Sequence, residues 1–378
     1  MKKIFLALLL IPILSLSQQT KEVLFIGNSY IYSNNLPSLI HGIALSFGDT
    51  LIYDSNTPGG ATFNMHSTNQ QTLSKINQQQ WDFVVLQAQS QEPSFSPGQV
   101  ANETYPYAEI LIDSIHDNSS CTEPLFFMTW GRKYGDQQNC QFYPPICTYL
   151  GMQQRLRESY LEMGLTDSAS CVPVGMAWKA SIDLDSTINL YSSDNSHPSI
   201  YGSYLAACTF YASIFKKSPV GSTYWPNAID SVTAYSLQQI GSSTVLDSLT
   251  VWNIFNANFN IQQINNSITC TNLSSNYESL LWDFGDNTVS VNEDPIHTYT
   301  TSGTYEVTLL ASSNRGCLVD THSVIISVDI NTAINDIKNP GQLIEITDIL
   351  GRKVTLSQSI PLLYHYDDGT VEKRIVIE

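Results

Sequence analysis

Hydrophobic and polar residues in the first two thirds of the chain form two kinds of segment. Short apolar runs with β-branched members predict buried strands. Between them, apolar residues recur every three or four positions, as at Leu36, Ile40, Ile43 and Phe47, which predicts helices with one buried face. The expected strands are 22–26, 51–54, 83–87, 125–129 and 171–174, and the expected helices are 36–47, 68–78, 105–116, 149–164, 198–215 and 227–239.

Strands that alternate with helices predict an α/β domain whose parallel sheet is layered by helices, here over residues 18–245. After about residue 245 the helical periodicity ends, and Ser, Thr, Asn and β-branched residues dominate. Short alternating strands separated by regular turns predict a β-sandwich over residues 255–330. Residues 331–378 are expected to form a small β-rich C-terminal tail with Asp and Gly turns.

The first seventeen residues have the pattern of a signal peptide. Lys2 and Lys3 precede a short apolar run over 4–14, and the small-residue pattern Ser15-Leu16-Ser17 follows. A membrane anchor is the alternative, but the run is shorter than the roughly 20 residues that a spanning helix needs. The sequence therefore predicts export, a secreted or cell-surface protein, and no transmembrane span.

The net charge of the chain limits the classes of binding partner that we expect. The 378 residues include 34 acidic and 17 basic side chains, a formal net charge of -17. Such an acidic surface argues against nucleic acid or anionic lipid as a partner. Hydrophobic residues make up 42% of the chain, which is enough for packed cores rather than disorder.

Seven cysteines in an exported chain predict disulfides and one odd thiol. Cys140 and Cys147 flank a short loop that a disulfide would close, and Cys208 lies on an apolar helical face as an expected free thiol. The other candidate pairs are Cys121 with Cys171 and Cys270 with Cys317. The sequence leaves this connectivity open. No CxxC or paired-His spacing occurs, so neither a metal nor a cofactor is expected.

Ser29 is the candidate nucleophile. It follows the first expected strand and the turn Gly27-Asn28, and ligands of open α/β sheets bind at the carboxyl ends of strands. A serine hydroxyl needs a base, and the base needs a group that holds its tautomer. Asp194 and His197, three residues apart before a predicted helix, supply both. Gly-Asn-Ser alone is an ordinary turn, so the case for an enzyme rests on the two segments together.

Other residues near the expected strand ends have candidate roles. A glycine N–H in the turn 58–62, which contains Gly60, and the side-chain amide of Gln87 are candidate oxyanion donors. Three further residues are candidates for substrate binding, although each also has a structural interpretation; they are Tyr30, Trp130 and Arg132. Three single histidines are expected on helix or loop surfaces: His41, His66 and His116.

These residues resemble the sequence blocks of the SGNH/GDSL hydrolases over about 20–215. Gly27-Asn28-Ser29 resembles the first block, Gly60 the second-block glycine, and Asp194-x-x-His197 the last block. The resemblance implies a flavodoxin-like three-layer α/β/α sandwich with Ser29 as nucleophile, His197 as base and Asp194 as its orienting group. It also implies an oxyanion hole formed by the N–H groups of Ser29 and Gly60 and by the third-block residue, Gln87. Two positions depart from the family pattern, because Asn28 replaces an Asp and Gln87 replaces the third-block Asn.

Residues 255–330 resemble a PKD domain. Trp282-Asp283-Phe284-Gly285-Asp286 carries the turn signature of that family, followed by His297-Thr298-Tyr299 and Gly303-Thr304-Tyr305. The resemblance implies a spacer or adhesion module. We expect Asp283 and Asp286 to cap turns rather than to bind calcium.

The C-terminal tail resembles a type A sorting domain of the type IX secretion system. The resemblance rests on Asp348-Ile349-Leu350-Gly351-Arg352 and on a final strand with Lys and Arg, whereas the usual Gly-x-Tyr segment is missing around 362–364. It implies an outer-membrane export route and the type IX machinery as a partner.

The interpretation that these features favour is a secreted serine esterase of the SGNH class. It would deacylate, and in particular deacetylate, a polysaccharide through an acyl-serine intermediate, with an acylated carbohydrate or another small ester as substrate. A lipase-like or thioesterase activity is one alternative. The other is a non-catalytic adhesion or glycan-binding protein on a degenerate hydrolase fold, which the substitution at Gln87 favours.

Overall fold

The computed structural model describes residues 18–313, 316–330, 341–354 and 361–375. The expected signal peptide, 1–17, lies outside the described residues. The chain divides into two compact units, with the boundary after Val328. Within the described part, no helix combines the length and the apolar character needed to cross a membrane.

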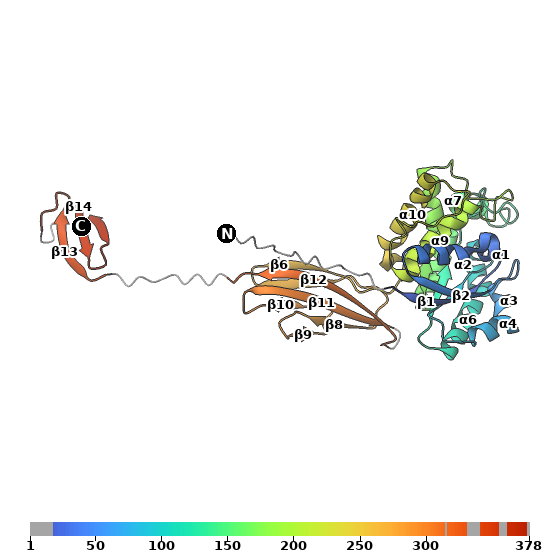
Figure 1. Ribbon diagram of the computed structural model, residues 1–378, viewed down its shortest axis with the longest axis horizontal. Helices are drawn as coiled ribbons and strands as arrows, with labels where there is room; N and C mark the ends of the chain where they lie inside the picture. Colours follow the sequence, from blue (N-terminus) through green and yellow to red (C-terminus); the bar gives the residue numbers. More distant parts are fainter. Residues whose placement is uncertain (1–17, 314–315, 331–340, 355–360, 376–378) are drawn as a thin grey trace, which may run out of the picture. The chain divides into compact units, whose positions relative to one another are not determined.

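Five parallel strands form the sheet of the α/β part (Figure 1). They are β1 (Thr20–Ile26), β2 (Thr50–Asn56), β3 (Phe83–Leu86), β4 (Glu123–Phe127) and β5 (Ser170–Val172). Their order in the sheet is β2-β1-β3-β4-β5. This is the order of the flavodoxin-like doubly wound fold, in which the order of successive strands along the sheet reverses between β1 and β3. The predicted fold class is confirmed.

Ten α-helices accompany this sheet in the described residues. They are α1 (Ser29–Tyr32), α2 (Leu36–Ser46), α3 (Phe63–Ser67), α4 (Gln70–Ile76), α5 (Pro97–Glu103), α6 (Tyr105–Asn118), α7 (Tyr149–Thr166), α8 (Val174–Leu184), α9 (Ile200–Phe215) and α10 (Ser231–Leu246). The sequence patterns predict no helix at α1, α3, α5 or α8, and they place Val174 in a strand. A short apolar run does not distinguish a strand from a buried helix, and here Val174, Ala177 and Trp178 are buried at helical spacing.

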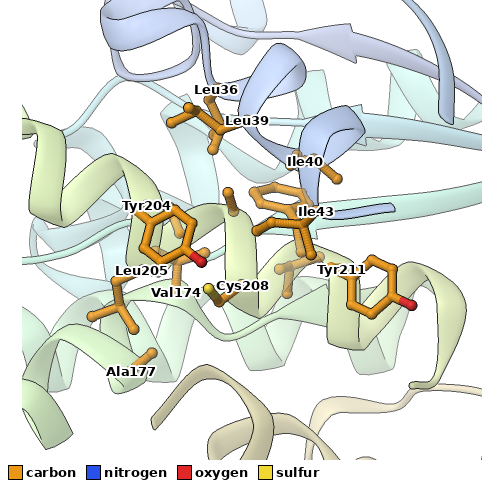
Figure 2. Packing of buried hydrophobic residues seen from close by; sticks show 14 of the residues in the cluster. Leu36, Leu39, Ile40, Ile43, Val174, Ala177, Tyr204, Leu205, Cys208 and Tyr211 are labelled. Atoms are coloured by element: carbon orange, nitrogen blue, oxygen red, sulfur yellow. The ribbon is translucent and has the colours of Figure 1, made fainter. Parts of the chain in front are cut away.

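The four strands β1, β3, β4 and β5 contribute alternate residues to two hydrophobic cores, one on each face of the sheet. In β1, Val23 and Phe25 enter one core, whereas Leu24 and Ile26 enter the other. The first core lies against α2, α8, α9 and α10, and the second lies against α4, α6 and α7. Figure 2 shows side chains of α2, α8 and α9 meeting in the first core. The carboxyl ends of the strands are thereby fixed between two helical layers.

A β-sandwich follows the α/β part. Its strands are β6 (Phe259–Ile264), β7 (Ser267–Asn272), β8 (Ser279–Asp283), β9 (Val289–Ser290), β10 (Ile296–Thr298), β11 (Gly303–Ser313) and β12 (Leu318–Val328), in sheets ordered β10-β7-β6 and β12-β11-β8-β9. Buried Trp282 meets Phe259 edge to face between the two sheets. Asp283 accepts a hydrogen bond from the Gly285 N–H (2.9 Å) and Asp286 from the Thr288 N–H (3.1 Å), so both cap the turn.

Two disulfides occur among the described residues. Cys140–Cys147 closes the predicted short loop, and Cys121–Cys317 joins the α/β part to the sandwich. The suggested pairings of Cys121 with Cys171 and of Cys270 with Cys317 are wrong. Cys171 lies in β5 and Cys270 in β7, both buried as free thiols, whereas Cys121 is in an exposed turn before β4. Cys208 is also buried and free, as the sequence predicts.

The second unit is a small antiparallel sheet. Its strands β13 (Leu343–Asp348), β14 (Pro361–Tyr366) and β15 (Val371–Ile375) lie in that order. Asp348 accepts hydrogen bonds from the N–H groups of Leu350 (2.9 Å) and Arg352 (3.0 Å), which closes the turn after β13. The predicted β-rich tail with an Asp turn is confirmed.

Candidate active site

A sharp turn delivers Ser29 from the end of β1. A Cβ atom at Gly27 would lie 2.6 Å from both Gln87 Oε1 and Ile31 Cδ1, so only glycine fits between the strand and α1. Asn28 is the N-cap of α1, and its side chain accepts a hydrogen bond from the Tyr30 N–H (3.2 Å). Ser29 therefore begins a helix at the carboxyl end of a central strand, where its N–H lacks an intrahelical partner.

Ser29, His197 and Asp194 form one hydrogen-bonded chain, although 168 positions separate the serine from the histidine. His197 Nε2 lies 2.8 Å from Ser29 Oγ. On the other side of the ring, His197 Nδ1 is hydrogen-bonded to Asp194 Oδ2. This is the order of contacts that lets an imidazole remove a proton from a hydroxyl while a carboxylate holds its tautomer.

The Asp194 carboxylate is held by its own loop. Its Oδ1 accepts hydrogen bonds from the N–H groups of Ser196 (3.0 Å) and His197 (2.9 Å) and from the Ser192 hydroxyl (2.8 Å). Burial alone would raise the pKa of the Asp194 carboxyl. Hydrogen bonds from the His197 ring, the backbone and Ser192 outweigh burial and keep that pKa well below its usual range. Asp194 is therefore ionised near neutral pH and able to stabilise a protonated His197.

A stack of aromatic rings supports the loop that carries the histidine. Tyr30 stacks on Trp130 with ring centroids 4.6 Å apart, and Trp130 stacks on Trp178 at 3.9 Å. Trp130 Nε1 donates to the Ser196 carbonyl (2.9 Å), and the Tyr30 hydroxyl lies 2.7 Å from Ser196 Oγ. Tyr30 and Trp130 are buried, so their faces are not open to a ligand, in contrast to the predicted substrate contacts. Their position instead fits a supporting role beneath the catalytic loop.

Arg132, beside this stack, has a hydrogen-bond donor that no group in the described residues accepts from. Its only ion pair in the described residues is with Asp136, at 4.0 Å, and its buried Nε has no hydrogen-bond partner there. The carboxylate of Asp136 is already engaged by Gln91 Nε2 (2.8 Å) and Asn139 Nδ2 (2.7 Å). The guanidinium remains a candidate for substrate contact.

The two other predicted oxyanion donors, Gly60 and Gln87, lie in different surroundings. Gly60 has a left-handed φ of +71° in an exposed loop where a Cβ would meet nothing within 4 Å. Ala61 follows Gly60 in this loop, and its carbonyl accepts a hydrogen bond from Asn28 Nδ2 (3.0 Å). This bond fastens the loop to the turn that carries Ser29. Gly60 thus stays a candidate donor.

Gln87 is fully buried below the turn rather than open to the site. Its Oε1 accepts from the Asn28 N–H (2.9 Å), and its Nε2 donates to the Ala88 carbonyl. With both ends of the amide bonded to backbone, Gln87 holds the nucleophile turn in place. This position differs from the predicted oxyanion donor, because the longer side chain folds back under the strand end.

His66 was expected on the surface, and that expectation is wrong. Its ring is buried, with Nε2 2.8 Å from the Gly27 carbonyl and Nδ1 2.8 Å from Thr72 Oγ1. Burial lowers the pKa of His66, against the effect of the bond to Gly27, so the ring is neutral at neutral pH. The Gly27 carbonyl can only accept, so Nε2 carries the ring proton and donates to it. Nδ1 of the neutral ring then accepts from the Thr72 hydroxyl, whose oxygen also accepts from Asn56 Nδ2 (2.7 Å).

Asn34 is a further residue that supports the site, and the sequence offers no reason to expect this role. In a left-handed conformation (φ 54°), its Nδ2 donates to the Pro198 carbonyl (3.2 Å) and to Ser203 Oγ (2.9 Å). It therefore ties the segment that carries Ser29 to the segment that carries His197. No pattern in the sequence distinguishes it from Asn35 beside it.

No group of three or more His, Cys, Asp and Glu side chains in the described residues is arranged to hold a metal ion. The chemistry that this arrangement can perform is nucleophilic attack by a serine with general acid–base assistance from a histidine.

Comparisons with known proteins assign the two larger parts of the chain. Residues 256–328 match the family model of the PKD domain. The PKD1 domain of the Vibrio cholerae metalloprotease PrtV is 36% identical over 20% of this chain and 98% of that chain, with a TM-score of 0.19. A search of curated protein sequences finds no match.

The α/β part matches solved structures by fold. A DUF4886 family protein from Bacteroides uniformis matches with a TM-score of 0.52 at 17% identity, over 60% of this chain and 95% of that chain. A putative SGNH hydrolase from Slackia heliotrinireducens matches with a TM-score of 0.43 at 22% identity, over 51% of this chain and 97% of that chain. At these identities the likeness concerns the fold alone.

Proposed function

We propose that this chain is a secreted serine esterase whose nucleophile is Ser29. The observation that carries the proposal is the hydrogen-bonded chain from Ser29 Oγ through both nitrogens of His197 to Asp194. A hydroxyl, an imidazole and an ionised carboxylate in this order at the carboxyl edge of a parallel sheet support acyl transfer. The α/β fold is consistent with it but does not carry it.

In the first half of the reaction, Ser29 Oγ attacks the ester carbonyl carbon while His197 Nε2 takes the hydroxyl proton. The negative charge that develops on the carbonyl oxygen is stabilised by the N–H groups of Ser29 and Gly60. When the tetrahedral intermediate collapses, His197 gives its proton to the leaving alkoxide, and the products are the alcohol and an acyl-Ser29 ester. Asp194 stabilises the charged imidazole between these steps.

In the second half, water takes the place of the alcohol. His197 removes a proton from the water as it attacks the acyl carbon, and it returns that proton to Ser29 Oγ as the acid leaves. The triad is thereby restored. The half-exposed His197 ring, 38% accessible, leaves water a direct approach.

We further propose acetyl esters on a polysaccharide as the substrate. The support is contextual: a PKD domain follows the α/β part, and two disulfides fit an oxidising, extracellular location. Export by the N-terminal signal peptide, and passage through the type IX machinery by the C-terminal unit, are part of the same proposal. A secretion assay on chains truncated after residue 330 tests the second of these.

Substitution of the nucleophile tests the activity. Ser29→Ala removes the attacking oxygen, so kcat for p-nitrophenyl acetate should fall by on the order of 10⁵–10⁶-fold. The far-ultraviolet spectrum and Tm should remain those of the wild type. Ser33→Ala, in the same segment but without a contact to His197, is the matched control and should keep full activity. Undiminished hydrolysis by the Ser29 variant would falsify the assignment.

The alternatives predict different results in two assays. A non-catalytic binding protein would not react with a fluorophosphonate, whereas the proposed enzyme is labelled at Ser29 and the Ser29→Ala variant is not. A lipase-like or thioesterase enzyme would prefer acyl chains beyond about six carbons over acetate, which a series of p-nitrophenyl esters measures.

A further inference from the structure

A cavity of about 240 Å³ lies behind the loop that carries Asp194 and His197. Three segments form it: the loop after β4, the start of α7, and the end of α8 with the residues that follow it. Its wall is largely aromatic and aliphatic, with tyrosines from each side at positions Tyr134, Tyr149 and Tyr191. Polar groups from Lys133, Ser186 and Asn189 interrupt that wall.

This cavity is continuous with the catalytic loop. The Lys133 N–H donates to the Asn195 carbonyl (3.0 Å), between Asp194 and His197. Tyr191 pairs with Pro198 as an isolated β-bridge, and its hydroxyl donates to the Gly131 carbonyl (2.6 Å). The residues that line the cavity are thus bonded to both ends of the loop that holds the base. A ligand in the cavity would therefore contact residues that are bonded to the loop of Asp194 and His197.

The aromatic and polar side chains that line the cavity indicate which class of ligand it would bind. Aromatic rings offer flat apolar faces, while side-chain amide, hydroxyl and ammonium groups satisfy a polar rim. A pyranose ring has both features, with an apolar C–H face and an outer ring of hydroxyls. The volume is below the roughly 300–1,000 Å³ of pockets for drug-sized ligands, which suits a single sugar unit.

Tyr134 is the residue most available to such a ring. Its side chain is 60% exposed, unlike buried Tyr191, and the Lys133 ammonium lies 5.9 Å from its ring centroid. We propose that this cavity is a subsite for a sugar unit next to the esterified one, with Tyr134 as a specificity-determining residue. The inference rests on the proposed function, since it names the substrate class for the same site.

Removal of the Tyr134 ring separates glycan binding from chemistry. In Tyr134→Ala, KM for acetylated tetrasaccharides should rise about tenfold, the effect of losing one aromatic contact. Both kcat on these substrates and kcat/KM for p-nitrophenyl acetate should stay within about twofold of the wild type. The probes are partially acetylated tetrasaccharides of glucose, xylose, mannose and N-acetylglucosamine. Tyr235→Ala, which removes a 49% exposed tyrosine from α10, is the matched control and should change none of these values.

Binding without turnover makes the two proposals distinguishable. Calorimetry with the Ser29→Ala variant and the unacetylated tetrasaccharides should detect binding that Tyr134→Ala weakens in the double variant. An unchanged KM in Tyr134→Ala, or a wild-type KM no lower for any tetrasaccharide than for its acetylated monosaccharide, overturns the subsite and leaves the esterase standing. Sugar binding by a chain that hydrolyses no ester overturns the esterase instead. A preference for long acyl chains that is lost in Tyr134→Ala shows that the cavity holds the acyl group and overturns the sugar subsite.

Discussion

Asn28 uses its backbone and both ends of its amide while only 2% exposed. Its N–H donates to Gln87, its Oδ1 accepts from the Tyr30 N–H, and its Nδ2 donates to the Ala61 carbonyl. The side chain thus joins the strand end, the helix start and the Gly60 loop. An aspartate carboxylate has no donor for the Ala61 carbonyl, which explains why the amide of asparagine suits this position.

Exchange of this amide for a carboxylate therefore has a predictable result. Asn28→Asp should lower the free energy of unfolding by at least about 1–3 kcal/mol, because the Ala61 carbonyl loses its partner and a charge is buried. Esterase activity should fall with it, since the Gly60 loop is no longer fastened to the nucleophile turn. Chemical denaturation and p-nitrophenyl acetate assays measure the two effects.

Asn69→Asp is the matched control for that substitution. The Asn69 side chain caps α4 as an acceptor, taking hydrogen bonds from the N–H groups of Gln71 (2.9 Å) and Thr72 (3.0 Å). A carboxylate accepts these bonds equally well, so stability should change little. Equal losses from both substitutions would show that the Asn28 donor has no special part.

At the scale of elements, the catalytic geometry depends on segments that bind one another by side chain to backbone contacts. Asn34, after α1, reaches Pro198 and Ser203 at the start of α9. Trp130, after β4, donates to the carbonyl of Ser196, which lies in the loop between α8 and α9. Ser29 and His197 are thereby positioned by separate elements that share few contacts of their own. A general base works only within hydrogen-bond reach of its proton, so these connections matter to the rate.

The short helix over Glu92–Ser94 carries a pH-dependent carboxyl. Burial, with a smaller contribution from the nearby Glu103 carboxylate, raises the pKa of Glu92 to about 7. The folded state therefore holds a proton that the unfolded state loses near pH 4.5. Between those two values the folded state binds more protons, so its stability falls as the pH rises.

Glu92→Gln removes this titration. The Tm of the variant, relative to that of the wild type, should rise between about pH 5 and pH 7 and level off at higher pH. Thermal unfolding at several pH values measures it, and Glu103→Gln should show a smaller change of the same sign. A constant difference across the range would contradict the raised pKa.

At the scale of the whole molecule, one disulfide connects the α/β part with the sandwich. Cys121 and Cys317 are 196 positions apart, whereas Cys140 and Cys147 are seven apart. In the chain-entropy account, the longer loop contributes about 5 kcal/mol and the shorter about 2–3 kcal/mol. Lys216 and Asp320 add an ion pair (2.9 Å) between the same two parts.

We expect the paired serine substitution of Cys121 and Cys317 to lower thermal stability more than that of Cys140 and Cys147. The reason is that the first crosslink restricts far more of the unfolded chain. Calorimetry under non-oxidising conditions should also show the α/β part and the sandwich separating into two transitions in the first variant only. A larger loss from the short loop would contradict this order.

The sequence by itself determined the layers of this protein and indicated a candidate site. Period-two and period-3.6 patterns reflect local geometry and burial, so they predicted the parallel sheet, most helices, the sandwich and the β-rich tail. Residue types at the strand ends also pointed to Ser29, His197 and Asp194. Helix α8 was missed because a short apolar run has no period long enough to distinguish helix from strand.

Only the tertiary structure decided which side chains meet. Gln87 and His66 lie beneath the nucleophile turn, Trp130 lies inside an aromatic stack, and Cys121 bonds to Cys317 rather than to Cys171. Each of these contacts joins segments far apart in the chain, and its formation depends on distances set by the packing of whole layers. Sequence spacing carries no record of those distances. The candidate triad could therefore be named from residue types, whereas the residues that hold Ser29 in place could not.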